Sequence, residues 1–224
     1  MLPQHHVSNC TLQRLPLYVS FLRSLPEDAR NISSTEIAKS LGLNPVQVRK
    51  DLAAVGSKGR PRVGYDIDWL TRHLTTYLSG GREYSAVLVG LGNLGRALTA
   101  HSGLADYGFA VKAVFDNNQT LVGSRFAGHQ VQEMHKLVPV CRQLQATVGI
   151  ITVPKEQAQP VCDLLVTGGV QIVWNFSPAH LTAPQGIIVQ DEDIAASLAL
   201  ITRQILGRRQ ADSGSATIQG GESA

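Results

Sequence analysis

The chain has 224 residues, 43% of them hydrophobic, which is enough for two small domains with packed cores. No segment is apolar enough to span a membrane, and residues 1–10 lack the charged start and apolar stretch of a secretory signal, so we expect a cytoplasmic protein with no membrane partner. The three cysteines (Cys10, Cys141 and Cys162) form no C-x-x-C pair, which favours ordinary thiols over redox switches or metal ligands.

The net charge of +3 is unevenly distributed along the chain. Residues 1–82 hold 11 Lys and Arg against 6 Asp and Glu, a balance of +5, whereas residues 83–224 hold 9 against 11, a balance of −2. A basic first part favours a polyanionic partner, because neutralising phosphates releases condensed counterions. A solvent-exposed surface without such a partner would give the same charge balance, so the local sequence pattern is needed to distinguish the two.

A helix-turn-helix is predicted in this first part. Ser33 lies three residues before Glu36, which is the arrangement of a capping box, and Gly42 ends the helix that follows. Asn44 and Pro45 are a second helix start, an N-cap followed by a proline in the first turn. The second helix has a buried face at helical spacing: Val48, Leu52 and Val55.

In this motif the second helix enters the major groove with its N-terminal residues near the base edges. Side chains that pair with bases or contact phosphate lie off its apolar face: Gln47, Arg49 and Lys50. The glycine-rich segment 56–64 then predicts a short hairpin, or wing, with a basic tip: Lys58, Arg60 and Arg62. With Ser33, these are the candidate DNA contacts of a winged-helix domain over 1–82. A solvated helix face and a loop that is basic for solubility are the alternatives.

A linking helix is predicted from residue 67, since apolar residues recur at helical spacing up to Leu78 before Gly80 and Gly81. Beyond it, a buried strand over 86–89 runs directly into a G-x-G-x-x-G turn and a helix, which is the context of a dinucleotide site. The candidate cofactor contacts in this turn are Gly90, Leu91, Gly92, Asn93, Leu94 and Gly95.

A second strand over 109–115 ends at Asp116, about 20 residues past the last glycine of the turn. An acid there accepts hydrogen bonds from ribose hydroxyls and repels a 2′-phosphate, so we expect NADH and NAD to be preferred over their phosphorylated forms. Asn117 beside it is a further candidate contact. A glycine turn that only serves the fold is the alternative.

The remainder alternates strands and helices, with strands over 148–153, 171–175 and 187–189 and a helix over 155–166. Loops at the carboxyl ends of parallel strands bind the ligands of open α/β sheets, so two loops are candidates for the nicotinamide pocket, with plain turn chemistry as the alternative. Their residues are Thr152, Val153, Pro154, Asn175, Phe176 and Ser177.

A last helix with an apolar stripe is predicted over 193–206. The predicted fold is therefore α/β, with an N-terminal winged helix-turn-helix domain (1–82), a C-terminal Rossmann domain that is doubly wound (83–207) and a disordered tail (208–224). Because this sheet uses nearly all of 85–207, no catalytic domain remains, and we expect no enzyme, no small-molecule substrate and no metal. An NAD-dependent oxidoreductase and a CoA-binding Rossmann protein are the rival functions.

Several separated pieces together resemble the Rex family of redox-sensing transcriptional repressors over about residues 11–207. The pieces are RLPLY (14–18), QVRKDL (47–52), VGY (63–65), GLGNLGRAL (90–98), FD (115–116), TVP (152–154), NFSP (175–178) and DEDIAASL (191–198). The resemblance implies a homodimer that binds a double-stranded DNA operator with inverted repeats and releases it when NADH binds. It also implies that the C-terminal helix is exchanged between the two partners.

The resemblance further implies a switch, in which an acid at the position of Asp193 changes partner between an arginine of the first helix and a tyrosine of the first Rossmann helix. This chain has Ser20 and His101 at those two places. The switch would then use His101, which would make it pH-sensitive, or Arg23, one turn beyond Ser20. The wing also departs from the family, whose basic-Arg-Gly before VGY is Arg-Pro-Arg at 60–62.

Overall fold

The computed structural model describes residues 7–193. Within this part, the chain forms two compact units, one of residues 7–84 together with 101–110 and the other of residues 85–100 and 111–193. The predicted helix beyond Asp193, its exchange between partners and the predicted tail over 208–224 lie outside the described residues. No helix of the described part is long and apolar enough to cross a membrane.

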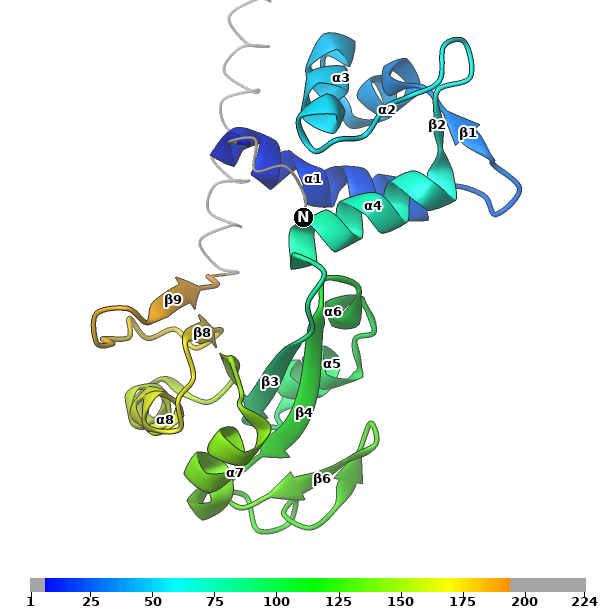
Figure 1. Cartoon of the computed structure of the whole chain (residues 1–224). Coiled ribbons are helices and arrows are strands. Elements are labelled where there is room, and N and C mark those ends of the chain that lie inside the picture. The colour runs from blue at the N-terminus through cyan, green and yellow to red at the C-terminus, as the bar shows by residue number, and fades with distance from the viewer. Residues whose placement is uncertain (1–6, 194–224) are drawn as a thin grey trace, which may run out of the picture. The chain divides into compact units, whose positions relative to one another are not determined.

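The first unit is a helical bundle with a two-stranded sheet (Figure 1). Its elements are α1 (Asn9–Arg23), β1 (Asn31–Ile32), α2 (Ser34–Leu41), α3 (Pro45–Ala54), β2 (Tyr65–Asp66), α4 (Ile67–Ser79) and α6 (Gly103–Asp106). Helix α1 lies along α4, and α2 packs on α3 as the predicted helix-turn-helix. The core contains the predicted apolar faces of α3 (Val48, Leu52) and of the linking helix α4 (Leu70, Leu74), together with Leu15 and Tyr18 of α1 and Ile37 of α2.

The local signals for these helices are confirmed. The hydroxyl of Ser33 accepts a hydrogen bond from the backbone N–H of Glu36 at 3.1 Å, and the Glu36 carboxylate accepts one from the Ser33 N–H at 2.8 Å. Gly42 ends α2 in the left-handed conformation at φ 65°. Asn44 caps α3 by accepting from the Val46 N–H at 2.8 Å. Short-range hydrogen bonds therefore fix both ends of the turn.

The predicted wing hairpin is shorter than expected. Arg60 and Gly64 close its tip through backbone hydrogen bonds of 2.7 and 2.9 Å, but the returning strand β2 pairs antiparallel with β1, so that Ile32 lies opposite Tyr65. Gly64 has φ 89°, and a Cβ there would lie 2.3 Å from the Ile32 carbonyl oxygen. Only a residue without a Cβ fits at position 64, and this close approach of the two backbones lets β2 pair with β1.

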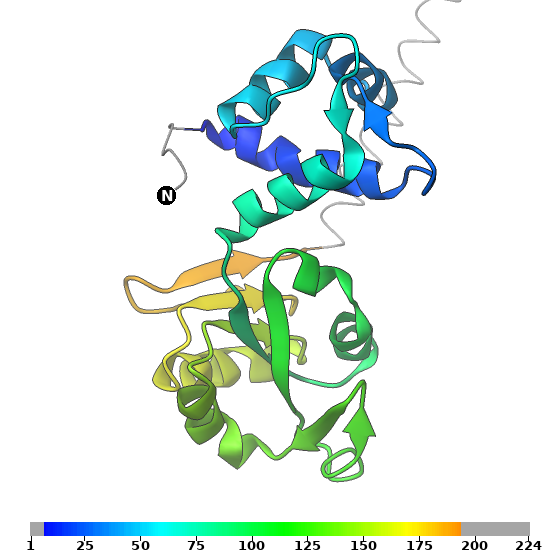
Figure 2. The ribbon, with the colours of Figure 1, turned by 45° about the vertical axis from the view of Figure 1, so that its right-hand side comes forward.

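The second unit is built on a seven-stranded sheet in the order β5-β6-β4-β3-β7-β8-β9 (Figure 2). Its strands are β3 (Tyr84–Val89), β4 (Phe109–Phe115), β5 (Arg125–Phe126), β6 (His129–Gln132), β7 (Val148–Ile151), β8 (Ile172–Asn175) and β9 (Ile188–Asp191). Its helices are α5 (Asn93–Ala100), the 3-10 turn η1 (Met134–Lys136), α7 (Leu137–Leu144) and α8 (Lys155–Thr167). The strands β3, β7, β8 and β9 run parallel, as the predicted Rossmann domain requires.

Helices α7 and α8 pack together on one face of this sheet, where they cover a core that includes Val87, Val89, Phe115 and Ile151. Figures 1 and 2 show α5 on the other side of β3 and β4. Alternate residues of one strand therefore point into the two layers, as in a doubly wound fold.

The sequence missed the segment between β4 and β7. Strand β5 has only two residues, too few to show alternation, and Pro139 interrupts the helical pattern of α7. The strand expected over 148–153 ends two residues earlier at Ile151. Thr152 and Val153 therefore belong to the loop that follows the strand.

All three cysteines are free thiols. Cys10 is exposed, whereas Cys141 and Cys162 are buried in the second unit. Burial raises the pKa of the Cys141 thiol to about 11, and burial together with the charge of Asp163 raises that of Cys162. The two buried side chains thus act as small apolar groups.

Candidate DNA-binding and nucleotide-binding sites

The predicted recognition helix α3 exposes Gln47, Arg49 and Lys50. Arg49 and Lys50 have no ion-pair partner among the described residues. Gln47, by contrast, already donates from Nε2 to Asp51 Oδ1 at 2.9 Å. Its amide oxygen and the second hydrogen of Nε2 remain available, so the side chain can still accept from a base and donate to one.

Asp51 is the centre of a buried polar cluster that joins α1 to α3. Its side chain is 1% exposed, and it accepts from the hydroxyls of Thr11 and Tyr18 at 3.0 and 2.6 Å. Arg14 makes a bidentate contact with this carboxylate, donating from Nε to Oδ2 at 2.7 Å and from Nη2 to Oδ1 at 2.9 Å. Burial opposes the charge of Asp51, but the hydrogen bonds from Arg14, Tyr18, Gln47 and Thr11 outweigh it and lower its pKa to about 2. The recognition helix is thereby fixed to α1 by a charged contact.

The wing presents Lys58, Arg60 and Arg62 on its surface. Arg62 has φ 65°, a left-handed conformation that disfavours residues with a side chain. It follows Pro61 in the tip closed by Arg60 and Gly64, a place where turns usually require glycine. This chain therefore holds a cation at the wing tip in a strained backbone conformation.

Ser33 lies at the N-terminus of α2, where backbone N–H groups could meet phosphate. Its hydroxyl also donates to Glu36 Oε2 at 2.7 Å. Hydrogen bonds from the backbone N–H and the hydroxyl of Ser33 lower the pKa of Glu36. The hydroxyl is thus committed to the capping box.

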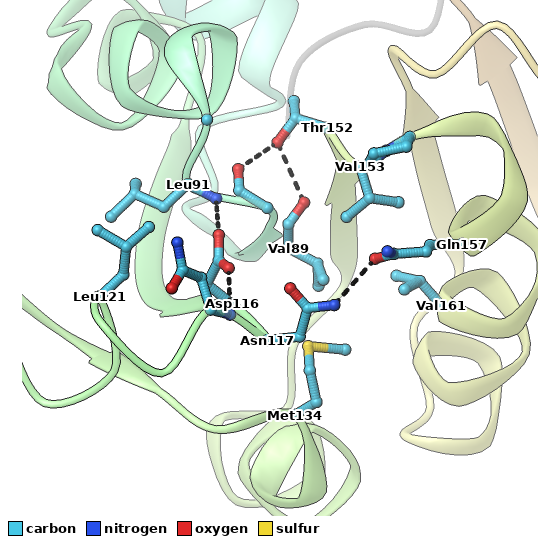
Figure 3. A pocket seen from close by; sticks show the side chains of 14 residues that line it. Val89, Leu91, Asp116, Asn117, Leu121, Met134, Thr152, Val153, Gln157 and Val161 are labelled. Carbon is cyan, nitrogen blue, oxygen red and sulfur yellow. Dashed lines mark hydrogen bonds between the residues drawn. The ribbon is translucent and has the colours of Figure 1, made fainter.

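The predicted glycine turn opens on a cavity of about 320 Å³ in the second unit (Figure 3). The cavity is lined by Val89, Gly90, Leu91, Gly92, Asp116, Asn117, Asn118, Leu121, Met134, Thr152, Val153, Pro154, Gln157 and Val161. Residues from the ends of β3, β4 and β7 thus meet at one edge of the sheet. This is the edge at which open parallel sheets bind ligands.

The three glycines of the turn have different surroundings. A Cβ at Gly95 would lie 1.9 Å from the carbonyl oxygen of Gly90, and a Cβ at Gly90 would lie 2.7 Å from that of Thr152. A Cβ at Gly92 would meet nothing within 4 Å. Gly90 and Gly95 are therefore required by packing, whereas Gly92 borders open space at the start of α5. The first N–H groups of that helix, from Asn93, Leu94 and Gly95, have no partner within it.

Asp116 follows β4 as predicted and is 9% exposed. Its Oδ2 accepts from the Leu91 N–H at 2.6 Å and its Oδ1 from the Asn118 N–H at 2.8 Å (Figure 3). Each oxygen keeps a second lone pair. The carboxylate therefore holds the glycine turn in place and still lines the cavity.

Thr152, on the opposite wall of the cavity, links that wall to the glycine turn by hydrogen bonds. Its Oγ1 lies 3.0 Å from the Val89 carbonyl oxygen and 2.6 Å from that of Gly90 (Figure 3). Asn117 reaches across the cavity mouth and donates to Gln157 Oε1 at 3.2 Å. Val153 and Pro154 complete this wall before α8 begins.

The other predicted loop, 175–177, does not line this cavity. Asn175 is fully buried and accepts from the N–H and hydroxyl of Ser177, while its amide group donates to Ala179 O and Asp191 Oδ1. All four of its hydrogen-bonding positions are used, so Asn175 supports the loop. Phe176, Ser177 and Asp193 line a separate cavity of about 180 Å³.

The two predicted switch residues lie in different units. Asp193 belongs to the cavity beside Phe176, in the second unit. His101 is exposed and belongs to the first unit, in the segment 101–110 that follows α5.

Sequence reasoning missed the side chains that give the main cavity its apolar wall and part of its rim: Asn118, Leu121, Met134, Gln157 and Val161. Leu121 and Met134 come from the segment that the sequence left without elements. Gln157 and Val161 are four residues apart on α8, one turn of the helix beside the loop at 152–154, and that spacing could have placed them.

Two family models and several relatives match this chain. A family model described as "CoA binding domain" matches residues 82–179, and one described as "Putative DNA-binding protein N-terminus" matches residues 6–53. The redox-sensing transcriptional repressor Rex of Bacteroides thetaiotaomicron is 37% identical over 87% of this chain and 89% of its own length. That of Desulfitobacterium hafniense is 36% identical over 91% of this chain and 97% of its own.

The chain belongs to the Rex family of redox-sensing transcriptional repressors. A crystal structure of RSP in complex with beta-NAD+ and operator DNA matches 95% of this chain and 99% of that one, with a TM-score of 0.79 at 28% identity. RSP in complex with beta-NADH matches with a TM-score of 0.78. The predicted fold class is confirmed, and so is the expectation of a regulator, since Rex-family relatives are named as repressors and not as enzymes.

Proposed function

We propose that this protein is a cytoplasmic transcriptional repressor that binds an inverted-repeat DNA operator as a homodimer and releases it when NADH binds. The observation that carries the proposal is the presence, in one Rex-family chain, of a helix-turn-helix with free cations and of a glycine turn that opens on a cavity. We retain the division into a DNA-binding domain over 1–82 and a nucleotide-binding domain over 83–207. A CoA-binding protein would share the second feature but has no use for the first.

In this proposal α3 reads the operator, with Arg49 and Lys50 at bases or phosphates and Gln47 at a base edge. Ser33 places the N-terminus of α2 at the DNA backbone. The wing brings Lys58, Arg60 and Arg62 to the minor groove or its phosphates. Because Asp51 fixes α3 to α1, the recognition helix meets DNA already ordered.

The dinucleotide would lie across the edge of the sheet in the second unit. Open space at Gly92 and the first N–H groups of α5 suit its pyrophosphate, from Gly90 through Gly95. Asp116, with Asn117, would accept from the ribose hydroxyls of NADH or NAD. The apolar side chains of Leu121, Met134 and Val161 suit the adenine ring. The loop with Phe176 and Ser177 would meet the nicotinamide end beside Asp193.

The switch would pass through Arg23 in preference to His101. Arg23 is ion-paired with Asp106 and lies 5.9 Å from the centre of the Tyr107 ring, whereas the side chain of His101 has no hydrogen bond or ion pair in the described part of the chain. Asp106 ends α6, the short helix that follows α5, and α5 starts at the glycine turn. Helix α1 also carries Arg14 and Tyr18, which contact Asp51. Helix α1 thus contacts both the segment after the nucleotide turn and the recognition helix, and Asp193 would act on this helix in the DNA-bound state.

The test is fluorescence anisotropy of an inverted-repeat operator from the protein's own promoter region, titrated with protein and then with NADH or NAD at fixed salt and pH. A full switch requires NADH to prefer the released form about 10⁴-fold, which two sites supply at about 100-fold each. We expect release by NADH at concentrations where NAD has little effect. Operator binding that is indifferent to both nucleotides would refute the proposal.

The same assay distinguishes the two switch residues. Arg23→Gln and Asp106→Asn should each reduce the release by NADH while operator binding without NADH persists, and His101→Ala should behave as the wild type. The reverse result, a wild-type response in Arg23→Gln and a lost one in His101→Ala, would assign the switch to the histidine.

A further inference from the structure

A basic cavity lies between the wing and α4, outside the recognition helix. It measures about 380 Å³ and is lined by Lys58, Arg60, Gly64, Tyr65, Asp66, Trp69 and Arg72. Three of these side chains are cations and one is an acid, so the cavity carries a net positive charge. Trp69 and Arg72 lie on α4, which sequence analysis treated only as a linking helix.

The cations of this cavity are fixed by the wing and by α4. Gly59 lets the wing pack on Tyr65, since a Cβ there would lie 3.0 Å from the tyrosine ring, and Lys58 and Arg60 flank that contact. Neither of them has a hydrogen-bond or ion-pair partner for its side chain in the described part of the chain. Arg72 donates from Nε to the Asp68 carbonyl oxygen at 3.2 Å, which leaves both Nη groups available. The acid Asp66 is committed to capping α4, because its Oδ1 accepts from the Trp69 N–H at 2.8 Å.

Trp69 forms a flat wall beside these cations. Its side chain is 43% exposed, and its ring stacks on that of His73 at 4.7 Å with an angle of 9° between the planes. His73 is anchored in turn, because its Nε2 lies 2.7 Å from the Val55 carbonyl oxygen, at the end of α3. The indole is thus held in one orientation although it is partly open to solvent.

We propose that this cavity binds a phosphate of the operator backbone next to the wing, with Lys58, Arg60 and Arg72 as donors and Trp69 against the adjoining sugar. The proposal rests on the proposed function and adds α4 as a third element that contacts DNA. Converging cations with unused N–H groups suit a phosphodiester, and such a contact positions the protein without reading sequence. The strength of DNA binding would therefore depend on Arg72 at any operator sequence.

The first experiment compares Arg72→Ala with the wild type in operator binding between 50 and 200 mM salt. Loss of one phosphate contact per protomer should weaken binding equally on operator and on unrelated DNA. It should also make the dependence of log K on log salt less steep by about 1.8 for the dimer, at about 0.9 per contact. Arg125→Ala is the matched control, because it removes the same charge from an exposed position of the second unit and should leave the slope unchanged.

The second experiment uses Trp69 as a probe of the site. The chain has two tryptophans, so in a Trp174→Phe variant the fluorescence reports on Trp69 alone. We expect operator DNA to change this emission, and inorganic phosphate at the same ionic strength to leave it unchanged. Two results together would overturn the proposal: a saturable change of the Trp69 emission by inorganic phosphate that Arg72→Ala abolishes, and operator binding by Arg72→Ala that equals that of the wild type. They would assign the cavity to a free anion.

Failure of this proposal differs from failure of the function. If the wild type binds the operator and Arg72→Ala binds it with the same affinity and salt slope, α4 makes no phosphate contact and the repressor function stands. If the wild type binds no DNA at all, both the phosphate contact and the repressor function are refuted.

Discussion

Asp51 in the DNA-binding unit and Asp116 in the nucleotide-binding unit are both buried, but they are held by different parts of the protein. Asp51 accepts five hydrogen bonds, all from side chains: Thr11, Arg14, Tyr18 and Gln47. Asp116 accepts from two backbone N–H groups, those of Leu91 and Asn118. The geometry of the recognition helix therefore depends on which side chains surround it, whereas that of the nucleotide turn depends on backbone shape.

This difference matches the two ligands. DNA recognition needs side chains that reach base edges, so α3 must be placed by contacts that leave its outer face free. A pyrophosphate is bound by N–H groups at close range, so the turn must keep side chains away. We therefore expect substitutions to reduce stability and ligand binding by removing side-chain partners in the first unit, and by adding atoms to the glycine turn in the second.

The largest effect is expected from Asp51→Ala. This change leaves the charged Arg14 and the Tyr18 hydroxyl without their acceptor and should destabilise the first unit by about 3–5 kcal/mol, with loss of operator binding. Urea unfolding and operator anisotropy measure the two effects. Thr120→Ala, which removes one exposed side-chain hydrogen bond in the second unit, is the control and should change stability by no more than about 0.5 kcal/mol and leave operator binding unchanged. Equal stability of Asp51→Ala and the wild type would show that the side-chain cluster does not hold α3.

The next effect is expected from Gly95→Ala. Its Cβ would collide with the Gly90 carbonyl oxygen, so α5 must shift, at a cost of about 2–3 kcal/mol and with loss of the response to NADH. Gly92→Ala is the matched variant, because its Cβ meets no protein atom within 4 Å. It should keep the stability of the wild type and still weaken NADH binding, as measured by calorimetry. Unchanged NADH affinity in Gly92→Ala would place the pyrophosphate elsewhere.

The charge of Asp51 should also appear in the pH dependence of stability. Its pKa is lowered from an ordinary 3.8 to about 2, so the folded state prefers the charged form. The stabilisation, about 2 kcal/mol, is complete above about pH 4 and is lost as pH falls through about 2. The difference in unfolding free energy between the wild type and Asp51→Asn should shrink across this range. A difference that stays constant from pH 5 to 2 would contradict the charged contact with Arg14.

The smallest effect is expected at the wing tip, where backbone shape and side-chain chemistry conflict. Arg62→Gly removes the strain at φ 65° and should stabilise the protein by about 1 kcal/mol while it weakens operator binding. Arg62→Asn tolerates the same backbone conformation without the charge and should weaken binding similarly. Tighter operator binding by either variant would show that the charge of Arg62 has no role at DNA.

The two units also differ in how far the sequence predicted them. The caps at Ser33 and Asn44 act within three residues, so the helix-turn-helix was predicted, and the glycine turn is equally local. The Asp51 cluster joins residues 33 to 40 positions apart, and no local pattern reports such a contact. The fourth partner, Gln47, was predicted as a DNA contact; it lies only four residues from Asp51 on α3, a spacing that could have indicated the bond.

At the nucleotide site, the strand ends placed Asp116 and Thr152 at one edge of the sheet, as predicted. The role of Asn175 was beyond sequence reasoning, because its partners Ala179 and Asp191 are fixed only by the fold of the loop and of β9. The apolar wall was missed because Leu121 and Met134 lie in short turns without a periodic pattern.

The most direct test of a coupled repressor is the affinity for NADH measured by calorimetry with and without saturating operator DNA. Coupling between two sites is reciprocal, so the factor by which NADH weakens DNA binding must equal the factor by which DNA weakens NADH binding. We predict a lower NADH affinity in the presence of operator, by the factor that anisotropy gives for release. The same NADH affinity with and without operator would contradict the account.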